Sequence, residues 1–330
     1  MTTRWTFLLA TWLLGCVLLA TAEDPAYDPL ALPDAAPPTV LDLTVTDGTR
    51  QRDIPIRVYL PAAEAAAPVL MFSHGLGGSR EGSAFLGQHW AGRGYVVVYL
   101  QHPGSDADVW KNADAKNRYA TLKKAGNLQN FMLRVQDVGA VLDQLTLWQA
   151  EAKHPLAGRL DLDRVGMSGH SFGALTTQAV AGQAIGPGGR TPFADARIDA
   201  AVIMSPSGPR MGKPADAFGA VTMPWLLMTG TKDTALIGNI SLEDRFVVYP
   251  ALPAGSKYEI VLYDAEHSAF TERALPGDKE PRNPNHHRVI LALSTAFWDA
   301  YLHDDPAARA WLDGPTARTI MEADDRWQHK

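Results

Sequence analysis

The sequence predicts an α/β protein with a mostly parallel, doubly wound sheet. Between residues 69 and 303, short apolar runs alternate with helix-like segments, and a continuously apolar run is typical of a strand buried on both faces. Before these runs, residues 41–45 and 54–60 alternate apolar and polar on either side of Asp47-Gly48. That pattern predicts an antiparallel N-terminal hairpin. Helical crossovers would then make the later strands parallel.

The elements can be assigned in chain order. Buried strands are predicted at residues 69–72, 95–100, 164–167, 200–204, 225–228 and 258–263, and helices at residues 83–92, 127–148, 172–184, 241–249 and 286–303. Residues 102–126 are polar, read as irregular and follow the carboxyl end of a strand, where open α/β sheets place their binding crevice. This segment is therefore either a solvated loop or a small lid over a substrate.

Composition limits the class of protein. The chain has 330 residues, of which 46% are hydrophobic and 20% charged, enough for one large core. Its formal charge is −6 and it has no long basic run, so nucleic acid is not an expected partner. Cys16 is the only cysteine. If the N-terminal segment is removed, no disulfide, thiol nucleophile or cysteine-bound metal is available.

The N-terminus has the layout of a secretory signal peptide. Arg4 precedes an apolar stretch and an Ala-x-Ala site that ends at residue 22, so we expect export to the periplasm or medium and no membrane span after cleavage. An uncleaved anchor and a lipoprotein modified at Cys16 are the alternatives. The Pro/Ala-rich residues 23–38 are predicted to form an extended tether, residues 39–305 the domain, and residues 306–330 a C-terminal extension.

Residues 169–173 read Gly-His-Ser-Phe-Gly and lie between a predicted strand and a predicted helix. A Gly-x-Ser-x-Gly sequence at such a junction is the pattern of a nucleophile elbow, which lifts the serine hydroxyl above the sheet edge. Ser171 is therefore the candidate nucleophile. The rival register at Ser168 lacks the second glycine. The alternative interpretation is that residues 169–173 form a glycine-rich loop whose surface serine has no catalytic role.

A serine nucleophile needs a base and an acid that orients the base. Asp233 follows the strand at 225–228, and His267 follows the last predicted strand, so Ser171, Asp233 and His267 occur in the required order and type of position. Asp199 precedes its strand and lies at the wrong end of the sheet, and His286 is expected to cap or solvate a helix.

An oxyanion site needs two backbone N–H donors. Phe172 follows the nucleophile at the start of a helix, where the helix dipole favours negative charge. Leu76 lies in the run Ser73-His74-Gly75-Leu76-Gly77-Gly78 after an apolar strand, and its glycines let backbone approach a substrate. Leu76 and Phe172 are thus the predicted donors, and His74 is expected to have a structural role.

These segments resemble the α/β-hydrolase superfamily over residues 40–305. Residues 71–78, 95–98 and 169–173 resemble its platelet-activating factor acetylhydrolase and predicted dienelactone hydrolase-like branch. The resemblance implies the α/β-hydrolase fold and a carboxylic-ester hydrolase. The chain departs from that branch because residues 204–208 contain no carboxylate, so the acid must come from the later strand. Dienelactone hydrolases proper use a cysteine nucleophile, where this chain has serine.

The expected activity is that of a secreted serine esterase that needs no metal or organic cofactor and acts on a small or lipid-like ester. The same residues would also suit a polyester or lipid-ester hydrolase, an acyltransferase or an amidase, and a silent fold used as a binding module is the alternative from another class. Pocket shape would depend on aromatic residues such as Trp110, Tyr119, Trp225 and Phe270.

Overall fold

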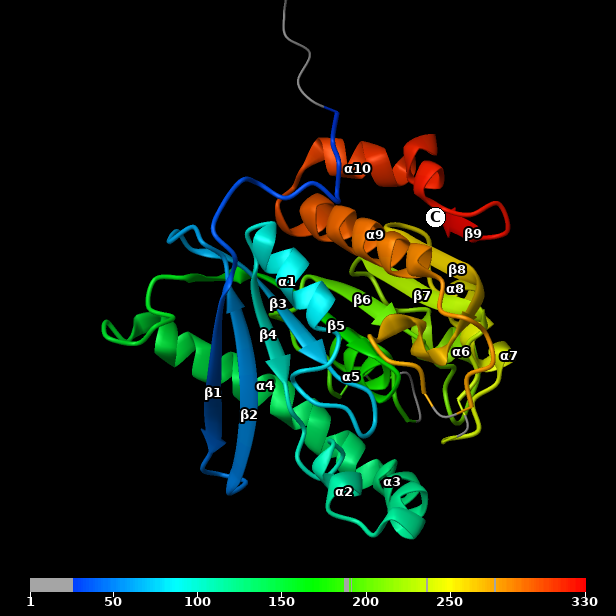
Figure 1. Ribbon diagram of the computed structural model, residues 1–330, viewed down its shortest axis with the longest axis horizontal. Helices are drawn as coiled ribbons and strands as arrows, with labels where there is room; N and C mark the ends of the chain where they lie inside the picture. Colours follow the sequence, from blue (N-terminus) through cyan, green and yellow to red (C-terminus); the bar gives the residue numbers. More distant parts are fainter. Residues whose placement is uncertain (1–25, 187–189, 191, 236, 276) are drawn as a thin grey trace, which may run out of the picture.

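The computed structural model describes residues 26–186, 190, 192–235, 237–275 and 277–330. The predicted signal peptide, residues 1–22 with Cys16, lies outside these ranges. Nine strands form one sheet in the order β1-β2-β4-β3-β5-β6-β7-β8-β9, with helices on both faces (Figure 1). The strands are β1 (Thr39–Asp47), β2 (Arg52–Leu60), β3 (Ala67–Ser73), β4 (Val96–Leu100), β5 (Leu160–His170), β6 (Ala200–Met204), β7 (Trp225–Lys232), β8 (Lys257–Glu266) and β9 (Arg326–His329).

The directions of the paired strands agree with the predicted, mostly parallel sheet. From β4 through β3, β5, β6 and β7 to β8, neighbouring strands are parallel. β1 and β2 form the antiparallel hairpin, β2 joins β4 antiparallel, and β9 closes the other edge antiparallel to β8. The mostly parallel, doubly wound sheet with an antiparallel N-terminal hairpin is therefore confirmed.

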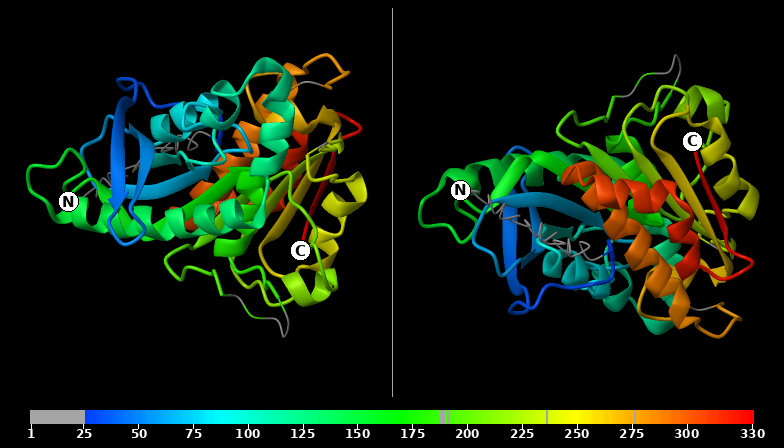
Figure 2. Two further views of the ribbon diagram at one scale, coloured as in Figure 1. Left: turned by 90° about the horizontal axis from the view of Figure 1, so that it is seen from below. Right: turned by 90° about the horizontal axis from the view of Figure 1, so that it is seen from above.

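Helices cover the sheet in two layers (Figure 2). The described helices are α1 (Ala84–Gly92), α2 (Asp108–Lys111), η1 (Ala115–Asn117), α3 (Arg118–Ala125), α4 (Leu128–Ala150), α5 (Phe172–Val180), α6 (Pro214–Phe218), α7 (Leu242–Phe246), α8 (Val248–Ala251), η2 (His267–Phe270), α9 (Pro284–Leu302), α10 (Pro306–Asp313) and η3 (Pro315–Ile320). α1, α9 and α10 pack on one face, and α4, α5, α6 and α8 on the other. None of these helices is long and apolar enough to span a membrane.

The sequence of strand β3 is apolar because both of its faces are covered by helices. Leu70 and Phe72 face the core under α1 and α9, whereas Val69 and Met71 face the core under α4. All four side chains are fully buried. Because successive strand residues point to opposite faces, a strand covered on both sides cannot alternate with polar residues.

The structure corrects the prediction that residues 102–126 are irregular. They contain the short helices α2, η1 and α3. Most of their side chains are exposed or only partly buried, so they lack the apolar stripe by which helices are recognised in a sequence. The predicted helix at 241–249 is also divided, into α7 and α8, and α7 begins with a capping box between Ser241 and Asp244.

Both ends of the described chain pack onto the domain. Residues 26–38 form no helix or strand, but the hydroxyl of Tyr27 donates a 2.8 Å hydrogen bond to Asp299 of α9. Residues 306–330 supply α10, η3 and β9, and Trp311 and Leu312 are part of the main core cluster. The C-terminal segment therefore completes both a helical layer and an edge of the sheet.

This packing predicts a stability effect for Leu312, which is fully buried. Leu312→Ala should lower the free energy of unfolding by about 2–5 kcal/mol, because it removes buried apolar atoms and leaves a cavity. Leu147→Ala, at a side chain that is 64% exposed on α4, should change it by about 0.5 kcal/mol or less. Urea denaturation of both variants measures the difference. Equal effects would contradict the integration of the C-terminal segment into the core.

Candidate active site

Three chain segments meet at the carboxyl ends of β5, β7 and β8. Ser171 directly follows β5, Asp233 directly follows β7, and His267 opens η2 after β8. His267 Nε2 lies 2.8 Å from Ser171 Oγ, and His267 Nδ1 lies 2.6 Å from Asp233 Oδ1. The structure thus brings the three residues predicted as nucleophile, acid and base into one hydrogen-bonded chain. Parallel strands end at the same sheet edge, which is why distant segments converge here.

The backbone at Ser171 has an unusual conformation. Its φ is 59° and its ψ is −114°, which side-chain-bearing residues rarely adopt. The Ser171 amide donates a 3.0 Å hydrogen bond to the carbonyl of Met204 on the neighbouring strand β6. This bond and the start of α5 immediately after it hold the turn. The observed strain is the kind expected where a hydroxyl must project from a tight strand-to-helix turn.

Both glycines of the turn are required by close packing. A Cβ at Gly173 would lie 1.8 Å from the carbonyl oxygen of Ser73, and a Cβ at Gly169 would lie 2.4 Å from the carbonyl oxygen of Gly173. No side chain fits at such separations, so α5 can start against β3 only with glycine at these positions. The motif that marks the turn in the sequence is therefore explained by backbone contacts.

The three side chains differ in their exposure to solvent. Asp233 is fully buried, the His267 side chain is 13% exposed, and Ser171 is half-buried. Burial by itself raises the pKa of Asp233, but the charge of Arg245 and the contact with His267 outweigh it and hold that pKa well below its usual value. Thr229 also donates a 2.8 Å hydrogen bond to Asp233 Oδ2. The carboxylate therefore stays ionised beneath an imidazole that solvent can reach.

Arg245 of α7 is a buried cation at this site that the sequence analysis did not identify. Its Nη2 lies 3.3 Å from Asp233 Oδ1, and its Nη1 donates 2.8 Å hydrogen bonds to the carbonyls of Ser205 and Pro206. It joins the segment after β6 to the carboxylate after β7. An arginine in a short, partly polar helix gives no sequence signal of this position, since most such arginines lie on the surface.

His170 was likewise not singled out as a site residue. Its Nε2 lies 3.0 Å from the carbonyl oxygen of His267, and its ring packs against the His267 ring with centroids 4.7 Å apart. Burial and the neighbouring His267 hold the pKa of His170 well below its usual value, so the ring is neutral and Nε2 can donate. His170 thus ties the nucleophile turn to the loop that carries His267.

The predicted oxyanion donors belong to two different segments. Phe172 is the first residue of α5, and Leu76 lies in the glycine-rich segment after β3. Within the described ranges, neither amide donates to a backbone carbonyl. A Cβ at Gly75 would lie 3.4 Å from the Cβ of Ser171, which shows how closely this segment approaches the serine.

A second Ser-His-Asp chain lies deeper in the protein. Ser73 Oγ is 2.9 Å from His102 Nε2, and His102 Nδ1 is 2.9 Å from Asp137 Oδ2. All three residues are fully buried. Asp137 is also bound by Arg50 and Arg52. Because no substrate carbonyl can reach Ser73, this chain is a structural network, whereas Ser171 is accessible.

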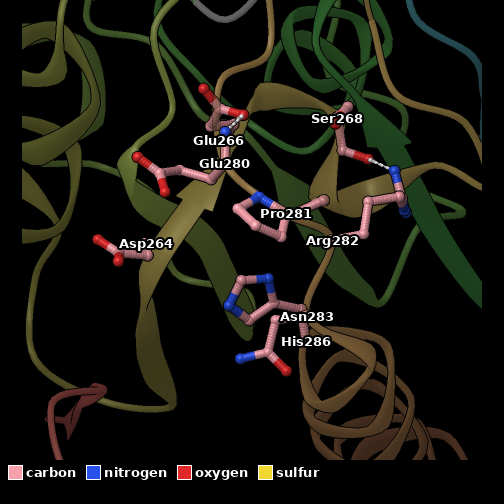
Figure 3. A pocket seen from close by; sticks show the side chains of 9 residues that line it. Asp264, Glu266, Ser268, Glu280, Pro281, Arg282, Asn283 and His286 are labelled. Atoms are coloured by element: carbon pink, nitrogen blue, oxygen red, sulfur yellow. Dashed lines mark hydrogen bonds between the residues drawn. The ribbon is translucent and has the colours of Figure 1, made fainter.

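A small pocket lies beside Ser268, the residue after His267 (Figure 3). Its volume of about 20 Å³ is room for about one water molecule. It is lined by Asp264, Glu266, Ser268, Ala269, Glu280, Pro281, Arg282, Asn283 and His286. It is too small for an ester. In the part of the chain that the structure describes, no group of three or more His, Cys, Asp or Glu residues is arranged to bind a metal.

The four aromatic residues expected to influence pocket shape separate into two groups. Trp225 and Phe270 are fully buried, and Phe270 packs against His170. Trp110 of α2 donates a 2.8 Å hydrogen bond to the carbonyl of Gly77, and Tyr119 of α3 is 55% exposed. The helical segment 102–126 therefore contacts the glycine-rich segment through Trp110.

The buried network predicts a pH-dependent stability. Burial, followed by the charge of Arg134, lowers the pKa of His102 to about 4, although Asp137 opposes this shift. The unfolded chain protonates His102 near pH 6.5 and the folded chain does not, so its contribution to stability is present above pH 6.5 and is lost as the pH falls to 4. The destabilisation caused by His102→Asn should therefore shrink by about 3 kcal/mol between pH 7.5 and pH 4.

Urea denaturation of both proteins at several pH values measures this difference. A destabilisation that is constant with pH, or that grows on acidification, would show that His102 is not held neutral in the folded state.

Comparisons with known proteins concern the fold and one segment of the chain. The family model of platelet-activating factor acetylhydrolase, isoform II, matches residues 51–138. These residues carry β3 and the glycine-rich segment. No curated protein matches the sequence significantly. Among solved structures, a ferulic acid esterase from Streptomyces cinnamoneus is similar with a TM-score of 0.63 and 19% identity, over 90% of this chain and 98% of that chain.

The structural neighbour demonstrates the fold over nearly the whole chain, and the family model covers the segment that follows the hairpin turn. Together with the sheet order, they identify the fold of the chain as the α/β-hydrolase fold.

Proposed function

We propose that the protein is a serine esterase in which Ser171 is the nucleophile, His267 the general base and Asp233 the acid that orients the base. The observation that carries the proposal is the hydrogen-bonded chain between these residues, with Ser171 half-buried at the top of a strained strand-to-helix turn. The matching acetylhydrolase family model and the esterase fold of the neighbour support ester cleavage.

In the acylation step, His267 Nε2 takes the proton of Ser171 Oγ while that oxygen attacks the ester carbonyl. The carbonyl oxygen becomes negatively charged and is stabilised by the amides of Leu76 and Phe172. Asp233 accepts a hydrogen bond from His267 Nδ1, which selects the tautomer with a free Nε2 and stabilises the imidazolium that forms. The protonated His267 then gives its proton to the departing alcohol oxygen, which leaves an acyl group on Ser171.

In the deacylation step, His267 removes a proton from water, and the resulting hydroxide attacks the acyl carbonyl. The same two amides hold the second oxyanion. Collapse of that intermediate releases the carboxylic acid and returns the proton to Ser171 Oγ. All of these proton transfers use the side chains of Ser171 and His267, so the proposed reaction requires no cofactor.

Ser171→Ala should reduce hydrolysis of p-nitrophenyl acetate by about 10⁴-fold or more, because it removes the oxygen that forms the acyl-enzyme. Ser168→Ala is the matched control, because it removes the serine of the rival register, whose hydroxyl is buried against the carbonyl of Met71. Its turnover should stay within about threefold of the wild type. Initial rates on esters of graded acyl length, with a feruloyl ester included, measure both variants.

A fluorophosphonate probe identifies the reactive serine independently. Peptide mass spectrometry should find the label on Ser171 and none on Ser73, the fully buried serine of the second Ser-His-Asp chain. Undiminished turnover by Ser171→Ala, or labelling at Ser73, would contradict the assignment. A protein that is neither labelled nor active on any of the esters would instead support a binding role for the fold.

We further propose that the protein is exported by its N-terminal signal peptide and acts outside the cytoplasm. The support is the order of a charged residue, Arg4, an apolar stretch and an Ala-x-Ala site ending at residue 22.

Expression of the full chain in a secreting bacterial host should therefore yield an extracytoplasmic protein that begins near Glu23. Mass spectrometry of the intact protein measures the N-terminus. A chain that retains Met1 would contradict cleavage, and a lipid-modified N-terminus at Cys16 would show that the protein is a lipoprotein.

A further inference from the structure

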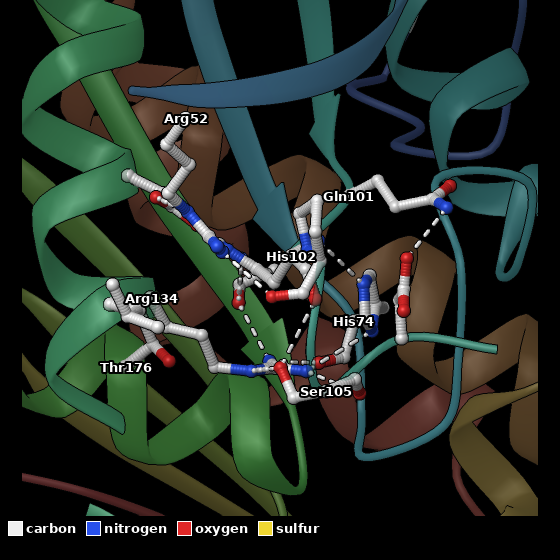
Figure 4. A network of polar contacts seen from close by, with 12 residues as sticks. Arg52, His74, Gln101, His102, Ser105, Arg134 and Thr176 are labelled. Atoms are coloured by element: carbon white, nitrogen blue, oxygen red, sulfur yellow. Dashed lines mark hydrogen bonds and ion pairs between the residues drawn. The ribbon is translucent and has the colours of Figure 1, made fainter. Parts of the chain in front are cut away.

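The peptide group between Gly75 and Leu76 has three polar contacts at its carbonyl oxygen. The carbonyl oxygen of Gly75 lies 2.7 Å from His74 Nδ1, accepts a 3.0 Å hydrogen bond from the Gly78 amide, and lies 3.4 Å from Arg134 Nη2. His74 and Arg134 belong to the polar network in Figure 4. The N–H at the other end of this peptide group belongs to Leu76, which is the oxyanion donor of the proposed function. The orientation of that N–H is therefore determined by the groups around the Gly75 oxygen.

The contacts of His74 determine which of its nitrogens carries a proton. The backbone amide of His102 donates a 3.2 Å hydrogen bond to His74 Nε2, so Nε2 is an acceptor. Burial and the charge of Arg134 hold the pKa of His74 well below its usual value, so the ring is neutral and has a single proton. That proton must lie on Nδ1, from which it is donated to the Gly75 oxygen.

Arg134 of α4 is fully buried and contacts both oxyanion segments. Its Nη1 donates a 2.6 Å hydrogen bond to the carbonyl of His74, and its Nε donates a 2.8 Å hydrogen bond to Ser105 Oγ. The guanidinium carbon lies 4.5 Å from the centre of the Phe172 ring. The cation is thus placed between the segment that carries the Leu76 amide and the residue that carries the second predicted donor.

The partners of this arginine make its burial costly. The oxygens to which Arg134 donates belong to hydroxyl and carbonyl groups, and within the described ranges it forms no ion pair with a carboxylate. Neutral acceptors compensate less for the loss of water around a charge than a carboxylate does. Its distance of 3.3 Å from His74 Nδ1 adds no hydrogen bond, because both atoms are donors.

A positive charge beside a peptide oxygen has a chemical effect at the other end of that peptide. It draws electron density toward the oxygen and makes the N–H a stronger donor, and the effect is large in a buried site of low dielectric. Hydrogen-bond donors that are already oriented stabilise a developing oxyanion without further reorganisation.

We infer that Arg134 and His74 are positioning residues for the oxyanion site, which hold the Gly75–Leu76 peptide in place and strengthen its N–H as a donor. This inference rests on the proposed function, since it assigns a role to the same site. Neither side chain touches the substrate. Both act through the Leu76 amide, and Arg134 acts in addition on Phe172.

The test compares Arg134→Met and Arg134→Lys, and His74→Ala and His74→Asn, with the wild type. Arg134→Met and His74→Ala should lower kcat on p-nitrophenyl acetate by about 10- to 100-fold, which is less than the loss of an oxyanion donor itself, while KM changes by less than about threefold. His74→Asn should recover part of the rate, because its side-chain amide can donate to the Gly75 oxygen from nearly the position of Nδ1.

Arg197→Met is the matched control, since it removes an arginine from an ion pair with Asp195 on the surface and should leave kcat unchanged. Circular dichroism and thermal unfolding check the fold of every variant.

A trifluoromethyl ketone inhibitor distinguishes positioning from general structural support. It adds reversibly to the serine hydroxyl and places a charged oxygen in the oxyanion site. Its Ki should rise across the variants in proportion to the fall in kcat/KM. A merely structural role would lower the rate without this proportionality.

The outcomes distinguish a failure of this inference from a failure of the proposed function. An active wild type whose folded Arg134→Met and His74→Ala variants keep kcat within twofold, or whose Ki for the ketone does not change as kcat/KM falls, overturns this inference alone. A wild type that hydrolyses none of the esters overturns the proposed function and this inference with it.

Discussion

The contact between the start of α5 and the end of β3 is the constraint on which the site depends. A Cβ at Gly173 would lie 1.8 Å from the Ser73 carbonyl oxygen, so the two backbones meet with no side chain between them. This approach places Ser171 beside the glycine-rich segment that follows β3, and the strained φ of 59° at Ser171 turns its hydroxyl out of the sheet. One packing contact therefore positions both Ser171 and the glycine-rich segment, which are the nucleophile and the oxyanion segment of the proposed reaction.

Two buried arginines near the site have different partners. Arg245 pairs with the carboxylate of Asp233 and also binds the carbonyls after β6. Arg134 binds carbonyls and hydroxyls around the glycine-rich segment. One cation thus keeps the acid ionised, and the other faces the end of the site where negative charge develops in the proposed reaction. Such charges are costly to bury and are expected where they serve a defined electrostatic purpose.

The proposed acid, Asp233, differs in position from the acid of the acetylhydrolase pattern that the sequence resembles. The segment after β6 begins with Ser205 and Pro206 and contains no carboxylate, and the hydrogen-bonded acid is Asp233 after β7. Arg245 bridges the two segments. The neighbouring strands β6 and β7 therefore present one carboxylate between them. Arg245 approaches the same oxygen of Asp233 as His267 does, and it also binds the carbonyl of Ser205 after β6.

Much of this arrangement can be predicted from local sequence. Apolar runs indicate strands covered on both faces, as in β3, and the Gly-x-Ser-x-Gly turn indicates Ser171 because its glycines reflect a local backbone conformation. Strand ends then place Asp233 and His267 at the same edge of the sheet. These features depend on short-range periodicity and on the order of elements along the chain.

The remaining features depend on contacts between residues far apart in the chain. Residues 306–330 are predicted from the sequence only as a C-terminal extension, and their role follows from the pairing of β9 with β8 and the burial of Leu312. Arg134, Arg245 and His102 are polar residues that the sequence alone would place at the surface. The tertiary fold compensates their burial with partners from other elements. Backbone carbonyls bind the two arginines, and a carboxylate contacts each of Arg245 and His102.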